Sequence, residues 1–191
     1  MKKWFLLILA VLLVGSAAQA KWPYGYLAGD TVGGPNGANR ICHVLGVPPY
    51  TEIELWVWFL PHPVKGMTAA EFRIVYPPSS DIIQGEVTAN PMTQVELGTL
   101  ASGMSVSLGE SNCQYNWTWT HKQILVLKTW TPLWIRLAGH PLNGGRIYVA
   151  SCEPGFPLYK CTPFQNFAIN QACVYGTKDA SWGAIKSLYE E

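Results

Sequence analysis

Apolar and polar side chains alternate with a period of two through much of this chain. The clearest run is residues 51–60, in which every second side chain is large and apolar: Ile53, Leu55, Val57 and Phe59. Alternation of this kind predicts a β-strand with one face in a core and the other facing away from it. Further runs of β type occupy residues 71–76, 82–88, 104–108, 115–120, 123–129, 133–138, 146–151 and 164–174.

Turn-forming residues separate these runs and narrow the choice of fold. The 18 glycines and 14 prolines interrupt the chain too often for a helical bundle. The strand runs do not alternate with helical runs, which disfavours a doubly wound parallel sheet. Short strands at spacings of about 8–12 residues are typical of β-sandwiches. The sequence therefore predicts an all-β sandwich over residues 51–178, preceded by an irregular, glycine-rich lead-in over residues 21–50.

The first 20 residues have the features of a secretory signal peptide. Lys2 and Lys3 provide the positive start, residues 4–14 are apolar, and Ala18-Gln19-Ala20 forms a small-x-small cleavage site. The apolar run is too short to span about 30 Å of hydrocarbon, and no later segment has the length of a membrane span. A lipoprotein would require a cysteine at the cleavage site, and none lies near it here. We expect a secreted or periplasmic protein without a membrane span.

A short helix is expected at the other end of the chain, over residues 179–191. Trp182, Ile185 and either Leu188 or Tyr189 recur at helical spacing. Asp179 or Ser181 could cap the helix N-terminus. We expect the apolar face of this amphipathic helix to pack on the domain.

Five cysteines follow the signal peptide: Cys42, Cys113, Cys152, Cys161 and Cys173. Disulfides are the expected state in an exported protein, and the absence of C-x-x-C argues against a zinc ribbon or a thioredoxin-type site. Two disulfides and one free thiol are the simplest arrangement. We favour Cys42–Cys113 and Cys152–Cys173 with Cys161 unpaired, while Cys152–Cys161 stays open because spacing does not determine pairing.

The charge balance and the motifs disfavour several classes of function. Thirteen Lys and Arg residues against twelve Asp and Glu, with no basic block, argue against a nucleic-acid binder that relies on phosphate neutralisation. The chain contains no phosphate-binding loop, nucleophile elbow, zincin motif or EF-hand loop. Its four histidines lie far apart and are expected in loops: His43, His62, His121 and His140. We therefore predict no catalytic residue, metal site or cofactor.

Glu52 and Glu54 are the carboxylate pair whose spacing comes nearest to an acid–base couple. On a strand they would share a face about 7 Å apart, which is within the range for glycosidases. The alternation alone already accounts for them as solvated charges at a strand edge, so we favour that interpretation.

Tryptophan is the most informative residue type, with nine in the chain and eight of them after residue 20. Trp56 and Trp58 are two residues apart and share a strand face, as do Trp117 and Trp119. If exposed, such a ladder of rings would form a platform for a protein or a glycan. If buried, the same rings would fill the space under the opposite sheet or the C-terminal helix. Both interpretations stay open.

Several segments resemble a group of uncharacterised secreted bacterial proteins. These segments are residues 66–74 (GMTAAEFRI), residues 144–149 (GGRIYV) before Cys152, and above all the tail over residues 181–189, with its W-G-x-I-K-S-L-Y string. More distantly, residues 71–76 (EFRIVY) resemble the strand pair that opens cohesin-like sandwiches, with Pro77-Pro78 in place of an Asp-Pro turn. The resemblance implies an Ig-like or cohesin-like β-sandwich in an exported protein.

The first hypothesis for function is a secreted, non-catalytic binding or structural module with a protein or glycan ligand. Its anchors would come from Trp117, Trp119, Trp56 and Trp58. A secreted hydrolase is the first alternative and would require a cleft with converging polar groups. A subunit of an extracellular assembly is the second and would require an exposed edge strand.

Overall fold

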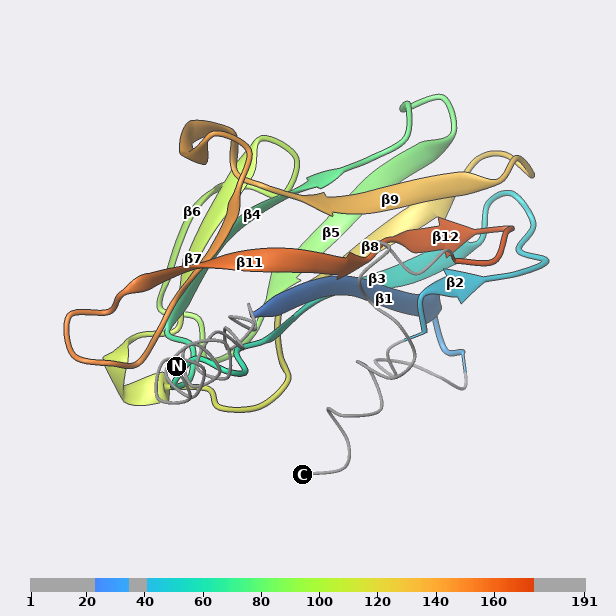
Figure 1. Ribbon diagram of the computed structural model, residues 1–191. Coiled ribbons are helices and arrows are strands. Elements are labelled where there is room, and N and C mark those ends of the chain that lie inside the picture. Colours follow the sequence, from blue (N-terminus) through green and yellow to red (C-terminus); the bar gives the residue numbers. More distant parts are fainter. Residues whose placement is uncertain (1–22, 35–40, 174–191) are drawn as a thin grey trace, which may run out of the picture.

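The computed structural model describes residues 23–34 and 41–173. These residues form twelve strands and two short 3-10 helices (Figure 1). The strands are β1 Tyr24–Thr31, β2 His43–Val44, β3 Glu52–Leu60, β4 Ala69–Val75, β5 Ile82–Ala89, β6 Val95–Thr99, β7 Gly103–Ser107, β8 Thr118–Leu127, β9 Leu133–Ala138, β10 Ile147–Ala150, β11 Leu158–Gln165 and β12 Phe167–Ile169. The 3-10 helices are η1 Glu110–Asn112 and η2 Pro141–Asn143. The predicted signal peptide and C-terminal helix lie outside the described residues.

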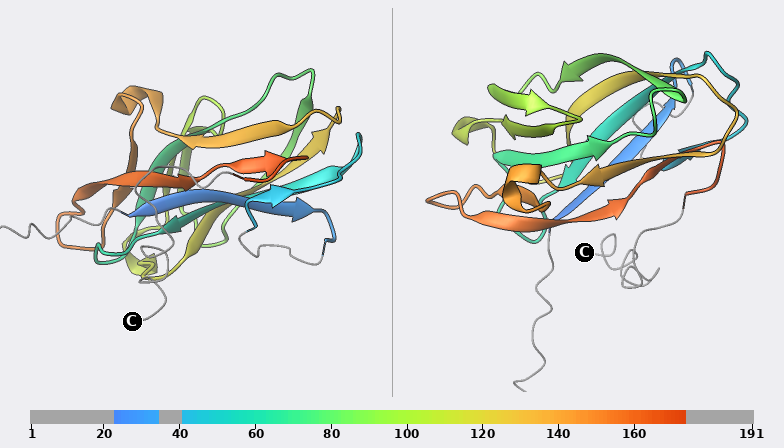
Figure 2. Two further views of the ribbon diagram at one scale, coloured as in Figure 1. Left: turned by 45° about the vertical axis from the view of Figure 1, so that its right-hand side comes forward. Right: turned by 90° about the horizontal axis from the view of Figure 1, so that it is seen from above.

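The strands form a two-layered β-sandwich, as the sequence predicts (Figure 2). One layer has the order β5-β8-β3-β1, with all pairs antiparallel. In the other layer β6, β7 and β4 pair in that order, and β4 then pairs with β10 along one half and with β9 along the other. Strand β11 joins the layers, because it pairs with β10 and, in parallel, with β1. Strands β5 and β6 lie at the opposite, open side.

The predicted alternation builds the core. On β3, four apolar side chains face the other layer and are at most 1% exposed: Ile53, Leu55, Val57 and Phe59. From the other layer, Phe72 and Ile74 of β4 face them and are equally buried. Burial of each such side chain stabilises the fold by about 1.5–3 kcal/mol. The intervening side chains of β3 and β4 therefore lie on the outer faces of the sandwich, where they can contact a ligand.

The prediction of an irregular lead-in over residues 21–50 is wrong for its first part. Residues 24–31 form β1, which pairs with β3 on one side and β11 on the other. Two glycines allow this central position: a Cβ at Gly25 would lie 2.9 Å from the Phe59 ring, and one at Gly29 would lie 2.5 Å from the Glu54 carbonyl oxygen. These glycines suggest a loop in the sequence, but in the fold they leave room for a side chain at Gly25 and for a neighbouring backbone at Gly29.

Four other strands differ from the expected runs. The runs over residues 115–120 and 123–129 are one strand, β8, and the run over residues 164–174 contributes only the end of β11 and the short β12. Strand β6 was not expected, and all five of its residues are exposed, so no buried face marks it in the sequence. Within the part of the chain that the structure describes, neither helical segment has the length or hydropathy of a membrane-spanning helix.

The disulfides join the expected four cysteines in a different pairing, Cys42–Cys173 and Cys113–Cys152, with Cα–Cα distances of 5.8 and 5.9 Å. Cys42 precedes β2 and Cys173 follows β12, and these two strands run parallel to each other (Figure 1). Cys113 and Cys152 follow η1 and β10, which meet only in the folded chain. Cys161 is the free cysteine among the described residues, as expected, and it is buried on β11.

Gly66 is predicted to be intolerant of substitution. Its φ is +79°, and a Cβ there would lie 2.7 Å from Sγ of Cys152 and also against Sγ of Cys113. We expect Gly66→Ala to lower the free energy of unfolding by at least about 2 kcal/mol, measured by urea unfolding. Gly46→Ala is the matched control, because Gly46 has a φ of +66° and open space around its Cβ position. An equal effect of the two substitutions would show that backbone strain alone is responsible.

The thiol of Cys161 is predicted to be unreactive in the folded protein. It is 1% exposed, and burial raises its pKa well above the usual range. Since the thiolate is the reactive form, we expect iodoacetamide to label Cys161 only after denaturation. Peptide mapping under non-reducing conditions should give the two disulfides above. Labelling of native protein at Cys161 would contradict the burial.

Candidate functional site

Four tryptophans meet on the outer face of the layer that contains β3 and β8. Trp56 and Trp58 lie on β3, Trp119 lies on β8, and Trp117 immediately precedes β8. The rings of Trp56 and Trp58 stack with centroids 6.2 Å apart, and Trp119 meets Trp56 edge to face at 4.9 Å. All four side chains are half-buried. The structure therefore brings both predicted pairs into one neighbourhood, with part of each ring accessible.

Tyr26 of β1 links the two pairs, and sequence reasoning did not find it. Its ring stacks on Trp58 at 6.3 Å with an interplanar angle of 10°, and it meets Trp117 edge to face at 4.8 Å. Tyr26 lies opposite Trp58 in the β1–β3 register, so it belongs to the same face. We call the five rings the aromatic cluster. The signal that was missed is the strand character of residues 24–31.

A bulge in β8 determines which side chains reach this face. Trp119 and Lys122 are three residues apart, so a regular strand would put them on opposite faces. The β3–β8 register shifts between Val57 and Trp58, which leaves Trp58 opposite Trp119 and Trp56 opposite Lys122. Because Trp56 and Trp58 share a face, the bulge turns both partners outward.

Charged groups at the border of the cluster are paired with each other. Lys122 Nζ lies 3.0 Å from a Glu54 carboxylate oxygen and 5.4 Å from the centroid of the Trp56 ring. The Trp56 indole N–H donates to the other oxygen of Glu54 at 3.0 Å. Glu54 thus orients Lys122 and Trp56. The expectation that Glu52 and Glu54 lie at a strand edge is wrong, because β3 is central in its layer.

The expectation that all four histidines lie in loops is wrong for His43, which begins β2, and for His121. His121 lies on β8 and is fully buried between the layers, with its ring 5.9 Å from that of Phe72. Its Nε2 lies 3.1 Å from a carboxylate oxygen of Glu96 on β6. The bulge that turns Trp119 outward places His121 inward, where the pair connects the two layers near the open side of the sandwich.

The half-buried Tyr76 and the buried Gln123, near the His121–Glu96 pair, are hydrogen-bonded to each other. The Tyr76 hydroxyl donates to the Gln123 side-chain oxygen, and burial raises the pKa of Tyr76 above its usual range. Gln123 in turn donates to the Gly85 carbonyl oxygen of β5. Buried polar groups need such partners, and these hold β8 to its neighbours.

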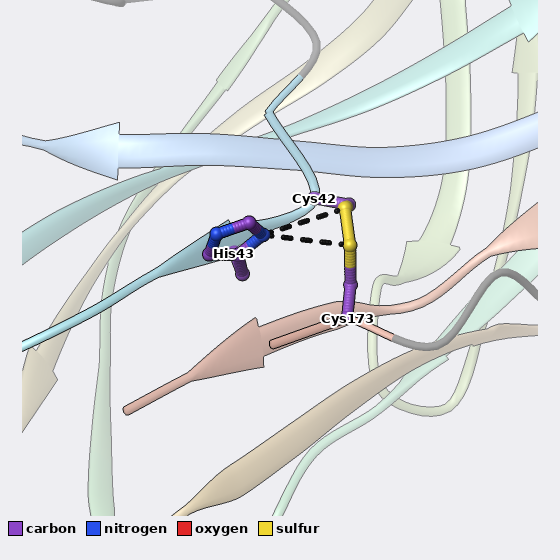
Figure 3. Close-up of side chains that lie close together, drawn as sticks. All are labelled: Cys42, His43 and Cys173. Atoms are coloured by element: carbon purple, nitrogen blue, oxygen red, sulfur yellow. Dashed lines mark hydrogen bonds between the residues drawn. A yellow bond between two sulfur atoms is a disulfide. The ribbon is translucent and has the colours of Figure 1, made fainter. Parts of the chain in front are cut away.

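His43 lies against the Cys42–Cys173 disulfide (Figure 3). Its Nδ1 is 3.7 Å from Sγ of Cys42 and 3.5 Å from Sγ of Cys173. Two sulfurs and an imidazole at this separation would suit a soft metal ion as thiolates. In the structure the two sulfurs form a disulfide, so neither is the thiolate that would ligate a metal ion.

The fold is that of cohesin modules, which confirms the cohesin-like β-sandwich. The seventh type I cohesin of ScaB from Pseudobacteroides cellulosolvens is 13% identical with a TM-score of 0.50, over 84% of this chain and 98% of that one. The sixth cohesin of scaffoldin B from Acetivibrio cellulolyticus, solved with a Cel5 dockerin, is 10% identical with a TM-score of 0.52, over 78% and 99%. A non-cellulosomal cohesin from the archaeon Archaeoglobus fulgidus is 9% identical with a TM-score of 0.50, over 84% and 96%. No protein-family profile and no curated protein sequence matches the chain.

The buried His121 predicts a pH dependence of stability. Burial lowers the pKa of its imidazole below the usual range, and the Glu96 carboxylate offsets part of that shift. The folded protein therefore binds fewer protons at this site than the unfolded chain, whose histidine pKa is about 6.5. The free energy of unfolding should fall as the pH drops through that value, by at most about 1.4 kcal/mol per pH unit.

Urea unfolding at about pH 7 and about pH 5 measures this effect. We expect His121→Gln to lose most of the decrease, because its side chain does not titrate. His62→Gln is the control, since His62 is exposed in the loop between β3 and β4. The same slope in wild type and His121→Gln would contradict the assignment to His121.

Proposed function

We propose that this chain is an exported, non-catalytic module that binds a protein partner through the aromatic cluster. The observation that carries the proposal is that five contiguous rings, half-buried except for the enclosed Tyr26, lie on the outer face of one layer. The cohesin fold supports a binding role, because a module of this fold was solved in complex with a dockerin. Export rests on the predicted signal peptide and agrees with the two disulfides.

The physical state of the rings suits a protein interface. Tryptophan and tyrosine are enriched among the residues that dominate binding energy, because each buries a large area with few rotatable bonds. Here the rings already hold one another in place by stacking and edge contacts. Binding would therefore cost little side-chain conformational entropy. The Glu54–Lys122 pair at the border is exposed enough to contribute more to orientation than to affinity.

Strand β6 gives some support to the assembly hypothesis. Among the described strands it pairs with β7 alone, and Val95 and Leu97 are more than half exposed. An exposed edge strand can add a strand from another chain. Because β6 is five residues long, we regard this as the secondary function.

A binding screen of the purified exported chain against extracellular proteins and glycans tests the proposal. We expect a protein ligand whose affinity falls by at least about 2 kcal/mol, near thirtyfold in Kd, in Trp56→Ala. Trp130→Ala is the matched control, because Trp130 is 62% exposed in the turn between β8 and β9, outside the cluster. Circular dichroism should show both variants folded.

Other results of the screen would reject specific parts of the proposal. Equal losses in Trp56→Ala and Trp130→Ala would remove the cluster as the site. Binding of glycans alone would replace the protein partner. Concentration-dependent self-association, with no ligand in the screen, would favour assembly through β6.

A further inference from the structure

A hollow of about 350 Å³ opens where strands β9 and β11 separate. Strand β12 pairs with β9, whereas β11, directly before it in the chain, pairs with β10 and β1. The chain therefore changes partners at Asn166 and leaves a gap in the pairing beside Leu137. Side chains of β4, β9 and β11 line this gap. It lies in the layer opposite to the aromatic cluster.

Two arginines from adjacent strands converge on this hollow. In the β4–β9 register, Arg73 lies opposite Ala138 and Val75 lies opposite Arg136. Arg73 and Arg136 are therefore diagonal neighbours, about 7–8 Å apart at the backbone, within reach of one ligand for side chains of this length. Arg136 is exposed and Arg73 is half-buried. Both guanidinium groups can thus approach the same point from one face.

Neither arginine has an acidic partner among the described residues. The carboxylates that pair with a basic side chain there contact Lys65, Lys122 or the His121 imidazole, and no Asp or Glu lines the hollow. The Nε of Arg73 is buried, and no protein atom in the described chain accepts a hydrogen bond from it. A buried donor without an acceptor is destabilising, and more so when the group is charged. The hollow is therefore bordered by positive charge that no described carboxylate neutralises, and the Arg73 guanidinium beside it has one unused donor.

The remaining walls are mixed in character. Val75 and Phe164 provide apolar surface, and Gln165 and Asn166 provide amides. The Gln165 amide nitrogen already donates to the Leu27 carbonyl oxygen, so that side chain is held in place. A cleft with an apolar wall and a few converging polar groups is typical of sites for small organic molecules.

We propose that this hollow, the Arg73–Arg136 pocket, binds the carboxylate of a small organic anion. A planar carboxylate matches the edge of a guanidinium, where two parallel N–H groups donate to its two oxygens. The Arg73 guanidinium would donate to the carboxylate, and Arg136 would supply the second charge. The carbon skeleton would lie against Val75 and Phe164. This site is independent of the aromatic cluster, so each proposal can fail without the other.

The probe is benzoate, which combines a carboxylate with a flat apolar ring, titrated into the full chain and followed by NMR. We expect saturable shifts with a millimolar Kd, weakened at least about tenfold in Arg73→Gln and in Arg136→Gln. Lys160→Gln is the matched control: it removes one positive charge from β11 outside the pocket and should leave the Kd unchanged within error.

Two further ligands separate the chemical alternatives. Benzyl alcohol keeps the ring without the charge, and inorganic phosphate keeps negative charge without the ring. We expect both to bind more weakly than benzoate. Benzyl alcohol binding as well as benzoate would show that the arginines are not used, and phosphate binding as well would show a general anion site. Either result, or the absence of saturable shifts with benzoate, would overturn the proposal.

A stability measurement guards against misfolding of the variants. Because Arg73 Nε has no protein partner, Arg73→Met should have a melting temperature at least equal to that of wild type. A clear decrease would mean that the guanidinium stabilises the fold, and would contradict the assignment of Arg73 to ligand binding.

Discussion

Apolar contact between the two layers is the constraint from which the rest of the structure follows. Phe59 of β3 and Phe72 of β4 meet at its centre with ring centroids 5.3 Å apart, and both are fully buried. Side chains on a strand point alternately to its two faces. Because Phe59 and Phe72 point into the core, the residues next to them in sequence point outward. Trp58 beside Phe59, and Arg73 beside Phe72, are outward residues for this reason. Both proposed sites are thus consequences of the same packing.

The two outer faces differ in chemistry, and that difference suggests different ligands. On the face of β1, β3 and β8, rings contact rings and the neighbouring charges Glu54 and Lys122 neutralise each other. On the face of β4 and β9, Arg73 and Arg136 have no acidic partner among the described residues. The first face suits a broad apolar contact, as in protein interfaces. The second suits a small anion.

Sequence reasoning succeeded where the determining pattern is local. The alternation in residues 52–60 and 71–76 identified β3 and β4 and their buried faces, because a period of two is a property of the strand itself. It failed at β1, where Gly25 and Gly29 look like loop residues until Phe59 and Glu54 are placed against them. It also missed β6, which has no buried face to produce a pattern. The Trp56–Trp58 pair was predicted to share a face, but not its contact with Trp119.

The sequence by itself determined the fold class and the buried faces of the main strands, because both follow from composition or short-range periodicity. Only the tertiary structure decided the pairing Cys42–Cys173 and Cys113–Cys152, the β8 bulge that turns Trp119 outward and His121 inward, and the approach of Arg73 to Arg136. Those features depend on contacts between residues far apart in the chain. Register and strand order set such contacts, and no short segment encodes either one.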